Sequence, residues 1–150
     1  MDRARNRDVE LVLPADHVAA AELSEGATAT LVSAQAIPRG LMGLDIGQIT
    51  RARYTEQIGR ARTIFWNGPM GVFEIEKFSA GTRAVALAVA GADAYSVVGG
   101  GDSVAAIEQA GVVDRIDHVS TGGGASLELL QFGTLPGIEA LCGRFEGITT

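Results

Sequence analysis

Cysteine is nearly absent from this sequence, since Cys142 is the only one among 150 residues. A single cysteine cannot form a disulfide within the chain, so the sequence gives no indication of an oxidising compartment. Residues 1–8 are charged and contain no apolar core for a signal peptide. A long apolar run is lacking too: Gly91 and Asp93 interrupt the stretch 84–98, which is too short and polar to cross a bilayer. These absences predict a cytoplasmic location and no membrane partner.

Basic residues are scarce as well. Twelve Lys and Arg against 18 Asp and Glu give a formal net charge of −6. General nucleic-acid binding needs a basic surface, so the balance argues against a nucleic-acid partner. A nucleotide is not excluded, because backbone amides and a metal ion can hold a phosphate chain. The hydrophobic content of 47% and the charged content of 20% are typical of one globular domain with its own core.

Short segments with strand and helix patterns alternate along the chain. Predicted strands cover residues 10–13, 17–21, 29–33, 63–66, 95–98 and 115–119. Predicted helices cover residues 50–58, 79–90, 103–110 and 125–131. Thr50 and Ser79 are the expected caps of the first two helices, which end at Gly59 and just before Gly91. The Gly- and Pro-rich segment 36–47 is expected to form an ordered loop.

The alternation predicts an α/β fold with βαβ units and a parallel sheet. Right-handed crossovers place the strand-to-helix loops at one edge of such a sheet. Ligands of open α/β sheets bind at this edge, where the strands end. Three of the loops, at 67–74, 99–103 and 120–126, have unusual sequences. Their shared position is the main indication of a binding site.

The loop 99–103 reads Gly-Gly-Gly-Asp-Ser and precedes a predicted helix. Unpaired amides and the helix dipole at such a position favour a phosphate group. Asp102 fits this environment if it holds a magnesium ion that bridges phosphate oxygens. The loop is not a Walker A motif, and Val104 stands where a dinucleotide fingerprint has its third glycine. A helix cap formed by Asp102 explains the carboxylate equally well.

The other two loops allow functional and structural interpretations. Gly122, Gly123 and Gly124 cost much entropy to order, which favours a close approach of the backbone to a phosphoryl group. A flexible or tightly packed turn is the alternative. In the loop 67–74, Val72 and Phe73 could form a wall for a base, with Glu74 as a ribose acceptor. By spacing alone, core positions for both apolar residues and a first-turn position for Glu74 are favoured.

Six segments together resemble the phosphoglycerate kinases, in order and in spacing. They are LVLPAD at 11–16, AIPRGLMGLDIG at 36–47, WNGPMGVFE at 66–74, GGGDS at 99–103, HVSTGGGASLELL at 118–130 and LPGIEAL at 135–141. The resemblance covers nearly the whole chain. It implies a reversible phosphoryl transfer between 1,3-bisphosphoglycerate and ADP that gives 3-phosphoglycerate and ATP in glycolysis. It also implies a three-layer, Rossmann-like parallel sheet, with 1–150 as a partial C-terminal nucleotide-binding lobe of a two-lobe kinase.

The resemblance also implies a role for each matched residue. Those expected to bind magnesium ATP or ADP are Gly43 and Leu44 at the adenine, Asn67, Pro69 and Val72 lining the pocket, Glu74 at the ribose, and Gly100, Gly101, Asp102 and Ser103 at the phosphates. Asp102 is the expected metal ligand. Gly122, Gly123 and Gly124 are expected to face the transferred phosphoryl group. Such fixed amides suit a reaction in which the protein mainly positions groups and stabilises charge.

Parts of the family pattern have no counterpart in these residues. The substrate lobe with its basic site is absent, and so is the segment that carries the phosphate-clamping lysines; Lys77 lies in a different motif. We therefore expect the isolated chain to be inactive, to bind nucleotide weakly or not at all, and to leave a sheet edge unpaired. The full-length enzyme is expected to be a monomer. A stand-alone nucleotide-binding module and a remnant that binds nothing remain as alternatives.

Overall fold

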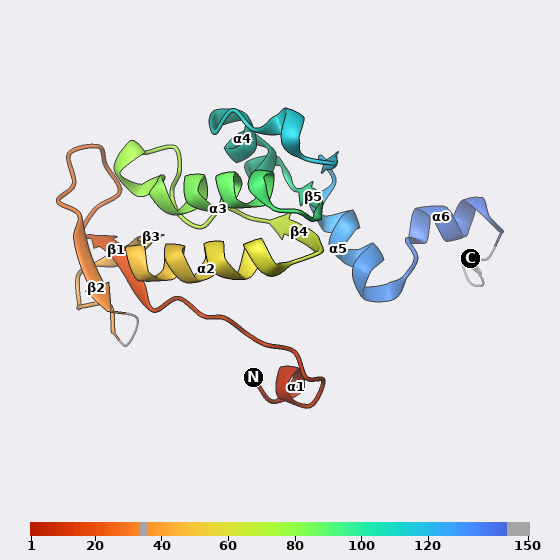
Figure 1. The fold of residues 1–150 in the computed structure, drawn as a ribbon, viewed down its shortest axis with the longest axis horizontal. Helices are drawn as coiled ribbons and strands as arrows, with labels where there is room; N and C mark the ends of the chain where they lie inside the picture. Colours follow the sequence, from red (N-terminus) through yellow and green to blue (C-terminus); the bar gives the residue numbers. More distant parts are fainter. Residues whose placement is uncertain (34–35, 144–150) are drawn as a thin grey trace, which may run out of the picture.

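The computed structural model describes residues 1–33 and 36–143, which form two sheets and a set of helices (Figure 1). The strands are β1 (Asp16–Ala20), β2 (Thr30–Ser33), β3 (Met42–Ile46), β4 (Thr63–Asn67), β5 (Tyr95–Gly99) and β6 (His118–Ser120). The α-helices are α1 (Asp2–Arg5), α2 (Gln48–Arg60), α3 (Ala80–Gly91), α4 (Gly101–Gln109), α5 (Gly123–Phe132) and α6 (Pro136–Leu141). Short 3-10 turns lie at η1 (Glu76–Phe78) and η2 (Val113–Arg115).

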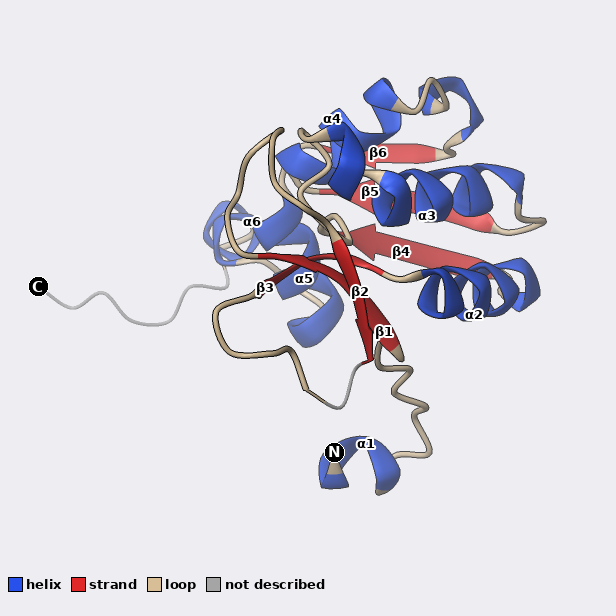
Figure 2. Ribbon diagram, turned by 90° about the vertical axis from the view of Figure 1, so that its left-hand side faces the viewer, coloured by secondary structure: helices blue, strands red, loops and turns tan. Residues whose placement is uncertain are grey.

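The second half of the chain forms the predicted parallel sheet. Its order is β4-β5-β6, with α3 and α4 as the two crossover helices (Figure 2). Helices α2, α3 and α4 pack on one face of the sheet and share a core with Trp66, Val98 and Ile107. Burial of these large side chains supplies most of the stability of this part of the fold. The α/β class and the incomplete Rossmann-like lobe are thereby confirmed.

The first half of the chain forms an antiparallel sheet that the sequence did not predict. Its order is β2-β1-β3, and β3 lies inside the segment 36–47, which was expected to be a loop. Pairing with β1 outweighs the low strand propensity of the glycines there. The predicted strand 10–13 is wrong for the opposite reason: its residues have no partner strand and form no regular element.

Helix α2 begins at Gln48 rather than Thr50 and continues through Gly59 to Arg60. Its cap comes from another element. The carboxylate of Asp16, at the start of β1, accepts hydrogen bonds from the amides of Ile49 at 3.0 Å and Thr50 at 2.8 Å. The Thr50 hydroxyl points back and donates to the same carboxylate at 2.6 Å. The prediction that Thr50 caps the helix was therefore wrong, since its hydroxyl fastens α2 to β1.

The remaining helix and strand starts lie within three residues of the predictions. Ser79 occupies the cap position of α3, but its hydroxyl donates to the Glu76 carbonyl, and the amide of Gly81 is capped by Asp45 at 2.7 Å. The strand predicted at 115–119 begins only at His118, after η2. Helices α4 and α5 each begin two residues earlier than predicted. The predicted starts excluded the glycines of both first turns, because glycine has a low helix propensity.

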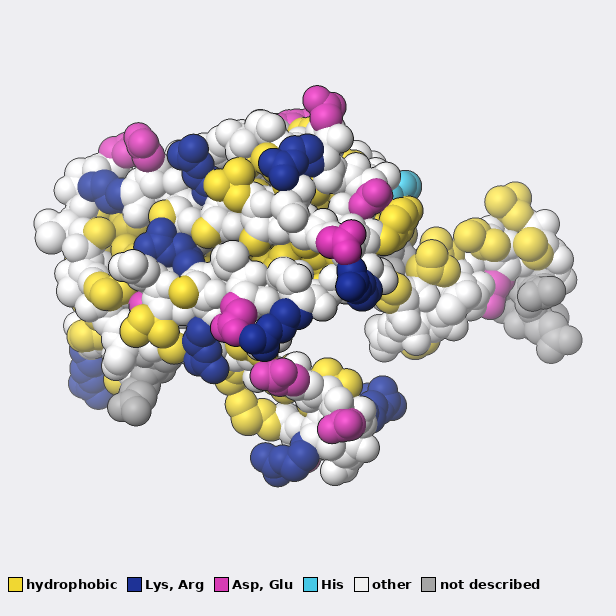
Figure 3. All heavy atoms as spheres, viewed as in Figure 1, with side chains coloured by type: hydrophobic (Ala, Val, Ile, Leu, Met, Phe, Trp, Pro, Cys, Tyr) yellow, Lys and Arg dark blue, Asp and Glu magenta, His cyan; other side chains and the backbone are white. Residues whose placement is uncertain are grey.

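Beyond β6 the chain leaves the compact body. Helices α5 and α6 form an arm on which Figure 3 shows hydrophobic side chains. Leu130, Phe132, Ile138 and Leu141 are among its exposed large hydrophobic residues. At the other end, the segment before β1 runs alongside α2 (Figure 1). In the described residues, the helices are all too short or too polar to cross a membrane.

Candidate functional site

The three loops singled out from the sequence meet at one edge of the parallel sheet. Asn67 at the end of β4 is paired with Gly99 at the end of β5, and Gly99 is paired with Ser120 at the end of β6. The strands therefore end in register, and each loop starts beside the next. The predicted neighbourhood of 99–103 and 122–124 is confirmed. It follows from the parallel topology, which brings together segments distant in sequence.

The two glycine loops touch each other through their backbones. A Cβ placed on Gly123 would lie 2.7 Å from the Gly100 Cα, closer than any side chain permits. Gly100 also has a φ of 94°, and its amide donates to the Ser120 carbonyl at 3.0 Å. Packing at position 123 and the positive φ at position 100 thus require glycine without any ligand. For these two residues, the interpretation of the loops as tightly packed turns is sufficient.

Packing does not explain the neighbouring glycines. A Cβ on Gly101 or Gly124 would meet no atom within 4 Å, and both residues are exposed at the first turns of α4 and α5. Gly122 has only ordinary contacts, at 3.9 Å. The surplus glycines therefore leave two adjacent helix starts open to solvent, with unpaired amides that favour an anion.

Asp102 is the acidic residue in the first turn of α4. It is exposed, and the cap position of this helix is held by Gly100 without any side-chain hydrogen bond. Within residues 1–33 and 36–143, the Asp102 carboxylate makes no hydrogen bond and no salt bridge. The alternative that Asp102 caps its own helix is not what the structure shows. One free carboxylate beside open amides suits a magnesium ion shared with phosphate oxygens.

Ser103 and Asn67 hold the loops together. The Ser103 hydroxyl, only 1% exposed, accepts a hydrogen bond from the Gly68 amide at 2.6 Å. The Asn67 side chain donates to the Gly123 carbonyl at 3.3 Å. These contacts link the loop after β4 to the starts of α4 and α5. Sequence reasoning missed them, because the partners lie 35 and 56 positions apart.

The loop 67–74 is fixed against β3. The Val72 amide donates to the Leu44 carbonyl at 2.8 Å, so these two predicted pocket residues are neighbours. A Cβ on Gly71 would meet the Asp45 backbone at 2.7 Å, which leaves no room for a side chain. Phe73 is buried in the core, as the structural interpretation of this loop predicted, whereas Val72 is half-buried and Glu74 exposed. Gly43 and Pro69 lie nearby in β3 and in the same loop.

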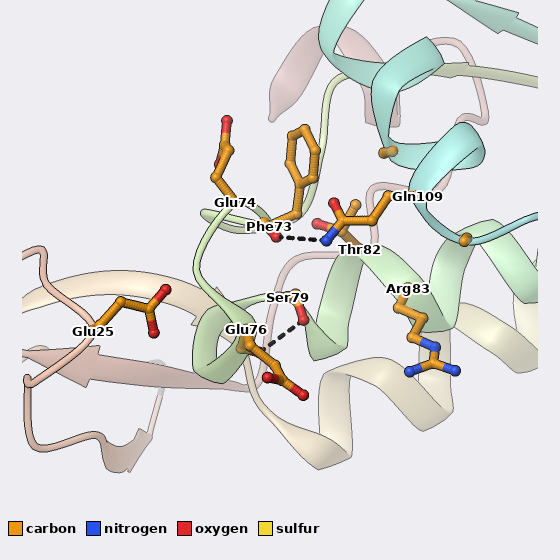
Figure 4. A pocket seen from close by; sticks show the side chains of 10 residues that line it. Glu25, Phe73, Glu74, Glu76, Ser79, Thr82, Arg83 and Gln109 are labelled. Carbon is orange, nitrogen blue, oxygen red and sulfur yellow. Dashed lines mark hydrogen bonds between the residues drawn. The ribbon is translucent and has the colours of Figure 1, made fainter.

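A hollow of about 340 Å³ lies beside Glu74 (Figure 4). Phe73 and Gln109 line it, and the Gln109 amide donates to the Phe73 carbonyl at 3.4 Å. The hollow faces the second half of α4, so its lining includes Glu74 but neither glycine loop. The nucleotide residues expected from the resemblance therefore lie along an open edge and do not enclose this cavity.

Two buried carboxylates below the loops serve the fold. Burial raises the pKa of Asp45, against hydrogen bonds from the Gly81 and Ile46 amides and the nearby Arg51 charge. Burial also acts on Asp16, but the hydrogen bonds from Thr50 and Ile49 outweigh it and lower its pKa. Both carboxylates are committed to helix starts. Neither is available for a ligand.

An α/β domain with adjacent glycine turns and an exposed carboxylate at its strand ends resembles the domains in which helix starts hold phosphate groups. Residues 1–132 match the family model described as phosphoglycerate kinase. The phosphoglycerate kinase of Anaeromyxobacter sp. (strain K) is 56% identical over 140 residues, covering 93% of this chain and 35% of the relative. That of Herpetosiphon aurantiacus is 53% identical over 141 residues, covering 94% of this chain and 36% of the relative.

Solved structures agree with the sequence relatives. The phosphoglycerate kinase of Coxiella burnetii superposes with a TM-score of 0.87 at 48% identity, covering 97% of this chain and 38% of the other. That of Pyrococcus horikoshii gives 0.71 at 37% identity, covering 88% of this chain and 33% of the other. The chain belongs to the phosphoglycerate kinase family. It spans about 35% of the length of the curated relatives that it matches.

Proposed function

We propose that this chain forms part of the nucleotide-binding lobe of a phosphoglycerate kinase, which transfers a phosphoryl group reversibly between 1,3-bisphosphoglycerate and ADP. One observation carries the proposal. The free carboxylate of Asp102 stands beside two helix starts whose exposed glycines, Gly101 and Gly124, have open space in front of them. Helix starts with unpaired amides favour phosphate groups, so the arrangement suits the phosphate chain of ADP or ATP.

The phosphate end of the site divides into two roles. Gly100, Gly101 and Asp102 hold the phosphates, with Asp102 as the ligand of a magnesium ion that neutralises charge on the transferred group. The amides of 122–124 face the transferred phosphoryl oxygens, where fixed donors stabilise developing charge. Ser103 supports the phosphate site indirectly. Its hydroxyl accepts a hydrogen bond from the Gly68 amide and so holds the loop after β4 against the start of α4.

The nucleoside end lies along β3 and the following loop. Gly43 and Leu44 border the adenine, and Val72, which donates to the Leu44 carbonyl, continues the same wall. Asn67 and Pro69 join this wall to the phosphate loops. Exposed Glu74 binds the ribose hydroxyls.

The activity needs more than this chain. The chain spans about 35% of its relatives, and neither a substrate lobe nor phosphate-clamping lysines occur in its sequence. 3-Phosphoglycerate and 1,3-bisphosphoglycerate are thus ligands of the whole enzyme, which we take to be a cytoplasmic monomer. The isolated chain is inactive on this account, because nothing closes over the nucleotide to exclude water.

A hybrid enzyme tests the proposal. Residues 9–143 replace the matching segment of the Coxiella burnetii phosphoglycerate kinase, and ATP formation from 1,3-bisphosphoglycerate and ADP is measured. We expect an active hybrid, in which Asp102→Ala lowers kcat about 100- to 1000-fold through loss of charge stabilisation. Asp114→Ala, in exposed η2, is the matched control and should leave kcat unchanged. A folded but inactive hybrid, or an unaffected Asp102→Ala hybrid, contradicts the proposal.

The second candidate is a nucleotide-binding module that works without catalysis. It is favoured by the fact that both glycine loops and Asp102 are already in place in this chain. Calorimetry of the isolated chain with magnesium ADP separates the two. We expect weak or no binding, because no lysine reaches the phosphates. Tight binding that disappears in Asp102→Ala supports the module instead.

A further inference from the structure

Thr82 is a buried polar residue to which the proposed function gives no role. It lies in the first turn of α3 and is 2% exposed. Its hydroxyl accepts hydrogen bonds from the Met70 amide at 3.0 Å and from the Gly71 amide at 3.2 Å. In the part of the chain that the structure describes, no other side chain accepts a hydrogen bond from the amides of 70–74. Helix α3 therefore holds this loop through one hydroxyl group.

The next amide of the loop is held from the other side. The Val72 amide donates to the Leu44 carbonyl of β3 at 2.8 Å. Three consecutive amides, those of 70–72, are thus fixed between α3 and β3. The Phe73 amide then donates to the Gly71 carbonyl at 2.9 Å, which closes a tight turn just before Glu74. These contacts determine where Val72 and Glu74 leave the loop.

The loop packs closely against β3 at Gly71. A Cβ at this position would lie 2.6 Å from the Leu44 carbonyl oxygen and 2.7 Å from the Asp45 Cα. The Asp45 carboxylate is in turn held by the amide of Gly81, one residue before Thr82, at 2.7 Å. Strand β3 and the start of α3 therefore form one continuous frame, and the Thr82 hydroxyl fastens the loop to it.

The phosphate end of the site is held by different contacts. The Ser103 hydroxyl accepts from the Gly68 amide, and the Asn67 side chain donates to the Gly123 carbonyl. Neither of these hydrogen bonds involves Thr82. The nucleoside end and the phosphate end of the site are thus fixed by two separate sets of hydrogen bonds.

We propose that Thr82 is a positioning residue for the nucleoside end of the site, where its hydroxyl sets the place of Val72 against the base and of Glu74 against the ribose. Thr82 acts through the loop, because its side chain is buried and its hydrogen bonds go to the backbone (Figure 4). This role rests on the proposed function. It adds a residue on which the affinity for the nucleoside depends, while the affinity for the phosphates does not.

Two substitutions at position 82 separate the hydroxyl group from the shape of the side chain. Thr82→Val keeps the branched shape and removes the acceptor, so the amides of Met70 and Gly71 lose their partner. Thr82→Ser keeps the acceptor and removes only a methyl group. If the hydroxyl positions the loop, serine retains the nucleotide affinity that valine loses.

Thr50 provides a matched control, because it has the same chemistry in another place. It is 0% exposed, and its hydroxyl accepts from the amides of Ala15 at 2.9 Å and Asp16 at 3.1 Å. Its hydroxyl also donates to the Asp16 carboxylate. Thr50→Val should therefore destabilise the fold at least as much as Thr82→Val. A purely structural role for Thr82 would give both valine variants the same binding properties.

The test measures two affinities of the hybrid enzyme by calorimetry, for magnesium ADP and for magnesium pyrophosphate, which has phosphates but no nucleoside. Thr82→Val should weaken ADP binding about tenfold and change pyrophosphate binding less than about twofold. Steady-state assays should show a raised KM for ADP with kcat nearly unchanged, as expected when only ground-state binding is lost. Thr82→Ser and Thr50→Val should bind both ligands like the unmodified hybrid.

Four results overturn the proposal: unchanged ADP affinity in Thr82→Val, equal weakening of both ligands, the same loss of ADP affinity in Thr50→Val, or a serine variant that behaves like valine. Circular dichroism shows whether the variants fold, and Thr82→Ala replaces Thr82→Val if the valine variant does not. An unmodified hybrid that does not bind magnesium ADP overturns the proposed function as well. Normal binding by that hybrid with an unaffected Thr82→Val variant overturns the role of Thr82 alone.

Discussion

A glycine at this site can serve packing within the protein or the approach of a ligand, and Gly123 and Gly124 separate these two roles. The missing side chain of Gly123 leaves room for the Gly100 backbone, at 2.7 Å from where a Cβ would be. Gly124, one position later, faces open space. The first glycine is required by the protein's own packing. The second is free of that requirement, and its backbone is open to an approaching ligand.

Paired alanine substitutions measure this difference. Gly123→Ala should lower the free energy of unfolding by about 1–3 kcal/mol, because the added methyl group forces two backbones apart. Gly124→Ala should leave stability unchanged or slightly higher, since alanine favours a helix. Urea denaturation of the isolated chain gives both values. Equal losses of stability in the two variants would contradict the distinction between packing glycines and ligand-facing glycines.

At the scale of elements, helices in this domain are capped from neighbouring segments. Asp16 at the start of β1 caps α2, and Asp45 in β3 caps α3. A Cβ on Gly47 would lie 2.2 Å from the Asp16 carboxylate, so the glycine before α2 is part of the same arrangement. These two caps therefore connect the antiparallel sheet to the helices that cover the parallel sheet.

The contribution of Asp16 depends on pH in a defined direction. Its pKa in the folded state is lowered from the ordinary value of 3.8, so its stabilising effect is complete above that value and is lost as the pH falls through the lowered pKa. Asp16→Ala should cost about 1–2 kcal/mol at pH 7, as for a lost helix cap. Urea unfolding at pH 7 and at pH 2 should show a smaller difference from the unmodified chain in acid. A difference that is constant or grows in acid would contradict the assignment.

The elements also show what the sequence could predict. The parallel strands and their crossover helices were found because their apolar runs are bounded by glycines at regular spacing. Strand β3 was missed, because Pro38, Gly40 and Gly43 suggest a loop and only pairing with β1 makes the segment a strand. The cap of α2 was assigned to Thr50 because local patterns cannot reveal that Asp16, 34 positions earlier, fills the role.

At the scale of the whole molecule, the described residues form a partial lobe. The sequence predicted the meeting of the glycine loops, since parallel topology brings strand ends together. It also predicted an unpaired edge, which is found at β4. The roles of single site residues stay predictions, because they depend on a nucleotide and on parts of the enzyme that this chain does not contain.

The central claim is that the two glycine turns and Asp102 hold one metal-linked phosphate chain. Its most direct test is NMR of the hybrid enzyme with manganese ADP, because the paramagnetic ion broadens amide signals near its site. The account predicts broadening at the amides of 100–103 and 122–124 together, and its loss in Asp102→Ala. Broadening of only one of the two turns, or the same broadening in Asp102→Ala, would contradict it.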